Sequence, residues 1–414
     1  MISEATEYAE ALKSGIEKLK DADDVLVAGS LRRGKETIGD IDILVVSKKP
    51  KSIMEAFVKL PLVSRILAQG ETKSSVVLKN GMQADLRVVP RKSFGAASHY
   101  FTGAKDHNIH IRQMAQKKGW KVNEYGIFDS KGRQIGGETE EEMFVKFGLK
   151  FIPPELREMR GEFEASKQNK LPDLIDLSDI KGDLQMHTKY SDGANTIEEM
   201  AEHAKKLGYS YIAITDHTKS TRIAGGLTEK EFLGELKYIE KLNSKGFKIL
   251  KGVELDILKD GSLDYSDAVL KECDVVIAAI HSNFKMPRKQ ITERIIKALK
   301  NKYVNILSHP TGRLIGKRDP YEVDIDELFK AAADTGTHLE INSQPDRLDL
   351  SDVHAKKAKE MGILLSIDTD AHSASQLEYM RFGVMTARRG WLEKKDAINT
   401  LPLNGLLKKL YQKR

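Results

Sequence analysis

The sequence contains almost no cysteine and no long apolar run, and each absence excludes a class of protein. Its 414 residues include a single cysteine, Cys273, which cannot form an internal disulfide, so any metal site must use oxygen and nitrogen ligands. The longest apolar stretches, such as residues 275–280, are much shorter than the ~20 residues of a membrane span. Residues 1–20 are charged and amphipathic, unlike the apolar core of a secretion signal. We therefore expect a cytoplasmic protein with no membrane partner.

Charge is distributed unevenly along the chain. The net charge is +6, yet residues 1–133 contain 23 Lys and Arg against 16 Asp and Glu, whereas residues 134–180 contain 6 against 11. A basic region followed by an acidic one is typical of a phosphate-binding face with a solvated linker, although ordinary surface charge explains the imbalance equally well. The length and the 40% hydrophobic content fit two or three globular domains.

The first half reads as a small mixed α/β domain followed by a second small unit. The expected elements of the first are an amphipathic helix at residues 3–19 and strands at 25–28, 41–46, 75–79 and 84–89. The second is helical in pattern up to Gly119 and extended afterwards. The stretch that follows contains paired prolines and many Glu, Lys and Asn residues, which is typical of a linker. We place these three segments at residues 1–92, 93–150 and 151–180.

The second half alternates short apolar runs with charged segments of helical pattern. Seven runs occur, at residues 183–187, 211–217, 249–254, 275–281, 304–309, 338–342 and 364–370. Alternation of strands and helices predicts a parallel barrel or a doubly wound sheet, and seven strands favour the barrel.

Almost every one of these runs ends in a side chain that can bind a metal ion. These side chains are His187, His217, Glu254, His281, His309 and Asp370, with Asp192 and His372 a few residues past two of the ends. The carboxyl ends of parallel barrel strands open at one mouth, so the side chains should converge there. Imidazole and carboxylate groups bind Zn, Mn and Fe, and such ions generate hydroxide near neutral pH. One such histidine would be an ordinary structural residue, but the whole set predicts a metal centre.

Two acids near the start of the chain form a second candidate site. Asp40 and Asp42 are two apart on an extended run, so both point to one face and can share divalent ions. They follow a small-residue turn at Gly29 and Ser30, whose backbone N–H groups could bind phosphates. The remaining parts are a third acid, Asp85, and two cations, Arg32 and Arg33. Acids that hold ions, together with donors for a triphosphate, predict two-metal phosphoryl transfer.

The motifs of the second half resemble those of the PHP (polymerase and histidinol phosphatase) phosphoesterases. The matching pieces are Asp183-Leu184-Gln185-Met186-His187, Ser191-Asp192-Gly193, Ile214-Thr215-Asp216-His217, Gly252-Val253-Glu254, His281-Ser282, Ser308-His309-Pro310 and Asp368-Thr369-Asp370-Ala371-His372. This resemblance implies a distorted (β/α)7 barrel over residues 181–414 with up to three Mn, Zn or Fe ions. The implied ligand sets are His187, Glu254 and Asp370; Glu254, His281 and His309; and Asp192, His217 and His372. Charge that develops on the phosphate would be stabilised by Arg313 or Arg347.

One position departs from the PHP pattern. The first motif of that family is often His-x-His, whereas here Gln185 takes the first place, and an amide is a poorer metal ligand than imidazole. Glutamine also stands there in the relatives fused to polymerases, so we keep Gln185 in the first metal site and interpret it as a subtype marker. We interpret His203, His338 and His354 as structural, and Asn342 as a residue that could orient a ligand.

The motifs of the first half resemble those of the family X DNA polymerases, which include DNA polymerase beta. The matching strings are Gly29-Ser30-Leu31-Arg32-Arg33-Gly34, Gly39-Asp40-Ile41-Asp42, Asp85-Leu86-Arg87, Tyr100-Phe101-Thr102-Gly103 and Asn123-Glu124-Tyr125-Gly126. This resemblance implies a nucleotidyltransferase palm and a thumb that use Mg²⁺ or Mn²⁺. The implied roles are catalysis for Asp40, Asp42 and Asp85; nucleotide binding for Gly29, Ser30, Arg33, Tyr100, Phe101, Gly103 and Asn108; and DNA contacts for Arg87 and Arg112.

A family X core joined to a PHP barrel is the arrangement of the bacterial and archaeal repair polymerases called PolX. The combined resemblance implies a DNA repair enzyme that fills gaps with dNTPs and processes 3′ ends as a 3′–5′ exonuclease, with cleavage of abasic sites as an additional activity. Members of that family carry helix-hairpin-helix motifs ahead of the palm, and no Gly-x-Gly hairpin precedes Gly29. We therefore expect weaker affinity for gapped DNA, or a separately encoded segment as a partner.

Two other functions remain open at this point. The first domain could bind nucleotide or DNA without catalysis beside an active phosphoesterase, although the intact Asp40, Asp42 and Asp85 argue against this. The barrel could instead be a small-molecule phosphatase of the histidinol phosphate type, which would leave the basic first domain unexplained.

Overall fold

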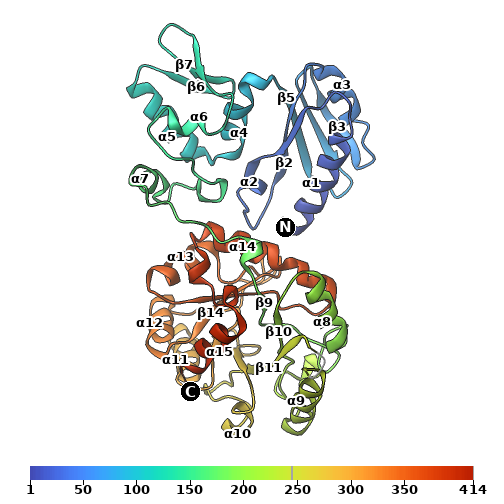
Figure 1. Ribbon diagram of the computed structural model, residues 1–414, viewed down its shortest axis with the longest axis vertical. Coiled ribbons are helices and arrows are strands. Elements are labelled where there is room, and N and C mark those ends of the chain that lie inside the picture. Colours follow the sequence, from blue (N-terminus) through green and yellow to red (C-terminus); the bar gives the residue numbers. More distant parts are fainter. Residues whose placement is uncertain (244–245, 414) are drawn as a thin grey trace. The chain divides into compact units, whose positions relative to one another are not determined.

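The chain folds into two units, Met1–Pro172 and Asp173–Arg414, which are drawn in Figure 1. The computed structural model describes residues 1–243 and 246–413. Among these residues, no helix combines the length and the apolar character that crossing a membrane requires. Mixed α/β domains are followed by a parallel sheet of seven strands, which confirms the predicted fold class.

A five-stranded sheet in the order β1-β2-β5-β4-β3 forms the start of the first unit. Strand β2 runs parallel to β5, and the other neighbours are antiparallel. Helix α1 buries Ile2, Leu12 and Ile16 because its apolar residues recur every three or four positions. Strand β3 was not predicted, since nearly all of its residues are exposed and the apolar alternation is missing. The elements are α1 (Ile2–Glu17), β1 (Asp24–Val27), α2 (Gly29–Arg32), β2 (Asp40–Val46), α3 (Pro50–Phe57), β3 (Val63–Gln69), β4 (Lys73–Leu78) and β5 (Gln83–Val89).

The rest of the first unit is a helical region with a small three-stranded sheet. The strands lie in the order β6-β7-β8 and are antiparallel. The elements are α4 (Phe94–Thr102), α5 (Lys105–Lys117), β6 (Lys121–Asn123), β7 (Gly126–Phe128), β8 (Gln134–Gly136), α6 (Glu142–Val145) and α7 (Glu162–Lys167).

Residues 151–172, predicted to form most of a linker, belong instead to the first unit. Ile152, Leu156 and Phe163 are buried. The buried Glu162 lies on α7 and contacts His107 of α5, with 2.9 Å between Oε1 and Nδ1. Some of its charged side chains have partners inside the unit, so polar composition alone does not distinguish this segment from a linker.

Arg157 is the clearest case of a charged residue buried in this segment. Its side chain is fully buried; Nη1 donates to Oε1 of Glu140 at 2.6 Å and Nε donates to the Ile152 carbonyl at 2.9 Å. Glu140 also accepts two hydrogen bonds from the guanidinium of Arg32. Burial opposes the charge on Glu140, but Arg157 and Arg32 hold its pKa below the usual value. One carboxylate thus joins the end of α2 to the segment between α6 and α7.

The second unit is a barrel of parallel strands in the order β15-β14-β13-β12-β11-β10-β9. A parallel bridge between Met186 and Ala371 joins the segments that directly follow the two outer strands. The strands are β9 (Gly182–Asp183), β10 (Tyr211–Ile214), β11 (Lys248–Asp256), β12 (Val275–Ala279), β13 (Ile306–Leu307), β14 (His338–Asn342) and β15 (Leu365–Asp368). The helices are α8 (Ile197–Lys206), α9 (Glu229–Asn243), α10 (Asp267–Leu270), α11 (Arg288–Leu299), α12 (Ile325–Thr335), α13 (Asp352–Glu360), α14 (Met380–Arg389) and α15 (Leu403–Tyr411).

Helix α15 packs at the amino-terminal end of the barrel strands. Its Leu406 and Leu410 belong to an apolar cluster with Tyr211 of β10 and Leu250 of β11. Past the helix, the Lys413 ammonium donates to the carbonyls of Leu299 and Val304 and to Thr337 Oγ1, at 2.7, 2.8 and 2.7 Å. This end of the barrel is therefore filled with apolar side chains and tied to the C-terminal segment.

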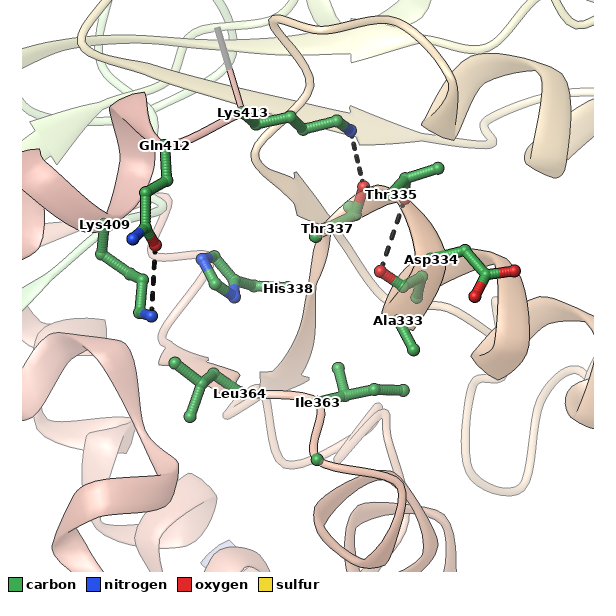
Figure 2. A pocket seen from close by; sticks show the side chains of 13 residues that line it. Ala333, Asp334, Thr335, Thr337, His338, Ile363, Leu364, Lys409, Gln412 and Lys413 are labelled. Atoms are coloured by element: carbon green, nitrogen blue, oxygen red, sulfur yellow. Dashed lines mark hydrogen bonds between the residues drawn. The ribbon is translucent and has the colours of Figure 1, made fainter.

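A pocket of about 380 Å³ lies beside these contacts, and Figure 2 shows Thr337, His338 and Lys413 along its wall. Burial, followed by the charges of Lys409 and Lys413, lowers the pKa of His338 to about 4. The imidazole is neutral at physiological pH. His338 lies at the start of β14. It is therefore at the opposite end of the barrel from the predicted metal ligands, which follow the carboxyl ends of the strands.

Replacing Glu140 with alanine should destabilise the first unit, because it removes the carboxylate that contacts the buried Arg157. Breaking a buried ion pair by removing one partner costs about 3–5 kcal/mol. The chain has two tryptophans, Trp120 in the first unit and Trp391 in the second. Urea unfolding followed by Trp120 fluorescence, in a Trp391→Phe background, should show a lower midpoint for Glu140→Ala.

The matched control is Glu141→Ala, which truncates the neighbouring exposed glutamate and should leave the midpoint unchanged. Equal midpoints for the two variants would contradict the role assigned to Glu140.

Candidate metal centre and carboxylate site

Glu254 lies at the centre of a cluster of histidines at the carboxyl ends of the barrel strands. It is part of β11 and is 1% exposed. One carboxylate oxygen, Oε1, lies 3.2 Å from Nε2 of both His281 and His309. The other, Oε2, lies 3.2 Å from Nδ1 of His217 and 3.3 Å from Nε2 of His187. Glu254 therefore faces two pairs of imidazoles, one pair on each oxygen.

Asp370 joins the cluster from the end of β15, an outer strand of the sheet. It follows β15, and its Oδ1 lies 3.0 Å from Nε2 of His187. Asn342, at the end of β14, donates from Nδ2 to Oδ2 of Asp370 at 3.0 Å, which fixes the orientation of the carboxylate. Burial favours the neutral acid, but the hydrogen bond to His187 and the charge of His372 hold the pKa of Asp370 well below its usual range. Asp370 is therefore ionised at neutral pH.

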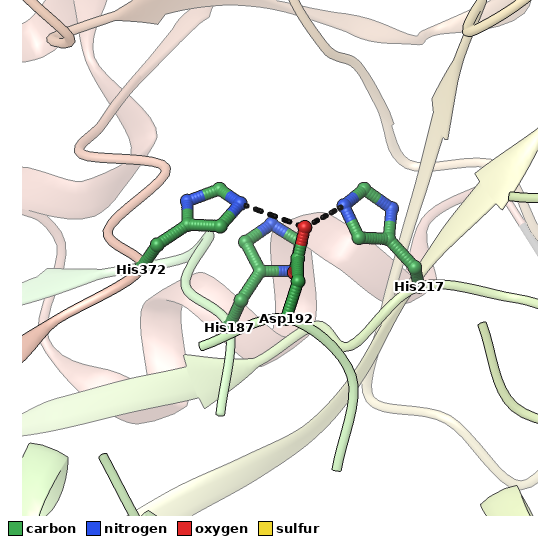
Figure 3. Close-up of side chains that lie close together, drawn as sticks. All are labelled: His187, Asp192, His217 and His372. Atoms are coloured by element: carbon green, nitrogen blue, oxygen red, sulfur yellow. Dashed lines mark ion pairs between the residues drawn. The ribbon is translucent and has the colours of Figure 1, made fainter. Parts of the chain in front are cut away.

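Asp192 faces three imidazoles, as Figure 3 shows. Its Oδ2 lies 3.5 Å from Nε2 of His372 and 3.8 Å from Nε2 of His217. Its Oδ1 lies 4.0 Å from Nδ1 of His187. The turn after Asp192 passes close to this histidine, because a Cβ at Gly193 would lie 2.4 Å from the His187 carbonyl oxygen. The small residue therefore lets the loop bring Asp192 to the cluster.

The donor atoms of the cluster fit divalent metal ions. Three groups have ligand atoms that lie within 4.8 Å of one another: His187, Asp192, His217 and His372; His217, Glu254 and His281; and His187, Glu254 and Asp370. Among the predicted His, Asp and Glu ligands of the described barrel, four buried atoms have no hydrogen-bond partner: Nδ1 of His187, His217 and His309, and Oε2 of Glu254. Buried polar atoms are normally paired, and imidazole with carboxylate is a donor set for Mn, Zn and Fe.

Two histidines of the cluster have raised pKa values. Burial would lower the pKa of His281, but Glu254 and Asp256 raise it to about 10. Burial also acts against the charge on His372, whose pKa Asp192 and Asp370 raise to about 9. Within the protein alone, protons on these two imidazoles therefore offset part of the negative charge of the acids.

The structure brings together the His, Asp and Glu side chains that the sequence predicts as metal ligands. His309 contacts Glu254 but lies outside the three groups of converging ligand atoms. Gln185 is fully buried, and its Oε1 accepts a hydrogen bond from Ser308 Oγ at 2.8 Å. The oxygen of this amide therefore already has one partner, which weakens it further as a metal ligand.

Two buried acids that orient the cluster were absent from the predicted site. Asp256 of β11 accepts a hydrogen bond from the backbone N–H of His281 at 3.2 Å. Glu340 of β14 accepts one from the backbone N–H of His309 at 2.7 Å. The period of two along a strand could have identified both, because Asp256 follows Glu254 by two residues and Glu340 precedes Asn342 by two.

The two arginines predicted to stabilise charge have different surroundings. Arg347 lines a cavity of about 240 Å³ over the cluster, and its Nε lies 3.6 Å from Oδ2 of Asp370. Within the described residues, its Nη1 is buried and has no hydrogen-bond partner. Arg313 donates instead to the backbone carbonyls of Arg347 and Leu348. Arg313 therefore supports the backbone that presents Arg347.

Strand register brings the acids of the first unit together. Strand β2 pairs with β5 so that Asp42 lies opposite Asp85 and Asp40 lies opposite Gln83. Burial, followed by the charges of Asp40 and Asp85, raises the pKa of Asp42 to about 6. Burial would raise the pKa of Asp85 too, but hydrogen bonds from Gln83 and Lys73 lower it. Divalent cations would relieve the repulsion among these carboxylates.

Gly29 begins the short helix α2, and Arg33 directly follows it. Gly29 has a φ of +68°, and a Cβ there would lie 2.5 Å from Oδ2 of Asp42, so glycine is required. Arg33 donates from Nε to Glu158 at 2.9 Å and from Nη1 to the Thr102 carbonyl at 2.7 Å. A triphosphate would therefore compete with Glu158 for the guanidinium of Arg33.

The other predicted nucleotide and DNA contacts lie mainly on β5, α4 and α5. The rings of Tyr100 and Phe101 meet edge to face at 5.1 Å, and the Arg87 guanidinium lies 4.4 Å from the Phe101 ring centre. Asn108 donates from Nδ2 to the Tyr100 carbonyl at 2.7 Å. A Cβ at Gly103 would lie 2.7 Å from Oδ1 of Asn108. Asn108 thus holds the turn after α4. The remaining predicted contacts, Ser30 on α2 and Arg112 on α5, are half-buried.

Three family models match the sequence. They are the DNA polymerase beta palm over residues 2–112, the DNA polymerase beta thumb over 97–158 and the PHP domain over 183–344. The thumb match extends past residue 150 into the segment predicted as a linker, in agreement with its burial in the first unit.

Curated relatives fall into two groups. The DNA polymerase/3'-5' exonuclease PolX of Bacillus subtilis (strain 168) is 46% identical over 381 residues, which are 91% of this chain and 66% of that protein. The chain thus spans slightly less than two thirds of the length of that relative. A probable phosphatase of Thermoanaerobacter sp. (strain X514) is 37% identical over 202 residues, and one of Acetivibrio thermocellus is 30% identical over 199. Each of these matches covers 46% of this chain and 78% of the relative.

Metal affinity at the barrel cluster should rise with pH. Protons on His281 and His372, with pKa values of about 10 and 9, compete with a metal ion for the same nitrogens, so binding must release them. Titration calorimetry with Mn²⁺ at pH 6, 7 and 8, in buffers of different ionisation enthalpy, should show tighter binding at higher pH and net proton release.

His203→Ala is the control, since this half-buried histidine of α8 lies outside the cluster and should leave the pH dependence intact. Affinity that does not change between pH 6 and 8, without proton release, would refute the charge balance described above.

Proposed function

This chain belongs to the PolX-type family, in which a DNA polymerase beta palm and thumb precede a PHP domain, and we propose that it is a DNA repair enzyme. It fills gaps as a DNA-directed DNA polymerase and processes 3′ ends as a 3′–5′ exonuclease or phosphoesterase. Cleavage at abasic sites fits the same metal chemistry. The substrates are gapped or nicked duplex DNA and dNTPs, and a helix-hairpin-helix segment is a candidate partner.

In the proposed polymerase site, Asp40, Asp42 and Asp85 hold two Mg²⁺ or Mn²⁺ ions. Such ions activate the primer 3′-hydroxyl and neutralise charge on the triphosphate. The protein positions the nucleotide: Gly29, Ser30 and Arg33 bind the triphosphate, and Tyr100, Phe101, Gly103 and Asn108 form the sugar pocket and the contact to the nascent pair. The proposed DNA contacts are Arg87 and Arg112.

In the proposed phosphoesterase site, the Glu254 cluster holds up to three Mn, Zn or Fe ions. Ions of this kind make water a stronger acid and polarise the phosphate. The ligands are His187, Asp192, His217, Glu254, His281, His309, Asp370 and His372, with Gln185 as a weak contributor to the first site. Arg347 stabilises the charge that develops on the phosphate, and Arg313 positions the Arg347 backbone.

The observation that carries the proposal is that one chain contains both the acids paired on β2 and β5 and the His, Asp and Glu cluster of the barrel. The three acids of the first unit favour nucleotidyl transfer over a palm that only binds nucleotide, because Asp42 lies opposite Asp85 in strand register. The likeness of the second unit to probable phosphatases supports a phosphoesterase. A small-molecule phosphatase would have no use for the acids of the first unit.

The two activities should be separable by mutation. On a 5′-labelled gapped duplex with Mn²⁺, extension requires dNTPs and degradation does not, so one gel reports both. Asp42→Asn should reduce extension by about a hundredfold or more and leave degradation intact, because a carboxylate that holds ions is lost. Glu254→Gln should reduce degradation and leave extension intact. Each variant is the control for the other.

Loss of both activities in either variant would contradict two independent sites. The unmutated protein can be tested with and without an added helix-hairpin-helix segment. If it degrades DNA ends but never extends them in either case, the first unit only binds its substrate. Hydrolysis of histidinol phosphate but not of DNA ends would favour the small-molecule phosphatase.

Arg347→Ala should lower kcat for DNA-end hydrolysis about a hundredfold without loss of metal, because a guanidinium that stabilises developing charge acts mainly in the transition state. The measurements are steady-state kinetics and bound metal by elemental analysis. Arg288→Ala is the matched control, since Arg288 is an exposed arginine of α11 paired with Asp324. A normal kcat for Arg347→Ala would exclude the proposed role.

A further inference from the structure

The cavity over the metal cluster has an apolar rim that hydrolysis of a bare phosphate does not require. Besides the predicted ligands and Arg347, its lining includes Ile223, Phe284 and Arg318. The Ile223 side chain is 100% exposed. Single exposed apolar side chains are common, but this one lines the cavity over the metal cluster, where it can contact an apolar part of a substrate.

The backbone around Ile223 is held in place by hydrogen bonds. The Leu227 N–H donates to the His217 carbonyl at 2.8 Å, and the Gly226 N–H donates to the Thr221 carbonyl at 3.2 Å. The Ser220 N–H donates to Oδ2 of Asp264 at 3.1 Å. The loop thus returns to the strand end that carries a cluster histidine. Ile223 is therefore presented by an ordered turn next to the cavity.

Phe284 and Arg318 supply a planar, cationic surface elsewhere in the cavity lining. The Arg318 guanidinium lies 4.2 Å from the Phe284 ring centre, and its Nε donates to the Gly312 carbonyl at 2.9 Å. The Tyr321 ring is within 15° of parallel to that of Phe284, with 6.3 Å between centres. Phe284 is thus supported by its neighbours in a defined orientation.

We infer that Ile223 and the Phe284–Arg318 pair bind the nucleobases beside the scissile phosphodiester. This inference rests on the proposed phosphoesterase function and names the side chains that contact the bases of its substrate. Nucleobases stack on aromatic and guanidinium surfaces whatever their sequence. Isoleucine is among the apolar side chains that insert against base steps. A phosphate flanked by bases would lie between the cluster and Arg347. The faces of those bases would then lie against the rim.

The test compares two 5′-labelled oligonucleotides with Mn²⁺ and the full chain. One has an ordinary 3′ end, and the other ends in two abasic tetrahydrofuran nucleotides. We expect kcat/KM of the parent protein to be about tenfold higher on the ordinary end, because only that end has bases to stack. Ile223→Ala and Phe284→Ala should each lower kcat/KM on the ordinary end severalfold, with little effect on the abasic end.

Val353→Ala is the matched control, because Val353 is an exposed apolar residue of α13 (52% exposed) that is absent from the cavity lining. It should behave like the parent protein on both substrates. Ile223 is fully exposed, so its truncation tests the inference even where Phe284→Ala fails to fold.

Two results would overturn the inference. Equal losses on both substrates would mean that the variants damage the metal centre, and no loss on either would mean that the rim does not touch the bases. Failure of the proposed function looks different: the parent protein would hydrolyse p-nitrophenyl phosphate but neither oligonucleotide. If the parent protein degrades DNA and both variants keep its ratio of kcat/KM between the two substrates, this inference is rejected and the proposed function stands.

Discussion

The second unit depends on one buried carboxylate, Glu254, whose two oxygens each face two imidazoles. Such a group is tolerated in the interior only where positive charge surrounds it. Protons on His281 meet part of that requirement, and metal ions would meet it more fully. Parallel strands make the arrangement possible because their carboxyl ends meet at one mouth. The same barrel has an apolar opposite end, where Leu406 and Leu410 pack.

The first unit solves a similar electrostatic problem with fewer groups. Parallel pairing of β2 and β5 places Asp42 opposite Asp85, and Lys73 offsets part of their charge. Asp42 nevertheless keeps a raised pKa, so this site also favours a bound cation. In the first unit, strand register brings Asp85 to the neighbouring Asp40 and Asp42, and in the second unit the convergence of strand ends brings the acids together. Each site is therefore only as well formed as the sheet beneath it.

The arginines divide into those that hold the structure and those available to phosphate. Arg157 is buried on Glu140, and Arg313 donates to backbone carbonyls, so both act on the fold. Arg347 keeps a buried donor that no described group accepts, as expected of a group that contacts substrate. Arg33 is intermediate, since any triphosphate bound there would have to compete with Glu158 for its guanidinium. Residue type alone does not distinguish these roles.

The sequence by itself determined the order of the palm, thumb and PHP regions, the barrel strands and nearly all the side chains that meet in the cluster, because apolar periodicity and polar strand ends are local signals. It did not predict the burial of residues 151–172, the contribution of Asp256 or the different roles of Arg313 and Arg347. Those features depend on polar groups that meet across the fold. Only the tertiary structure decided them, since periodicity records which face of an element is buried but not which distant partner that face meets.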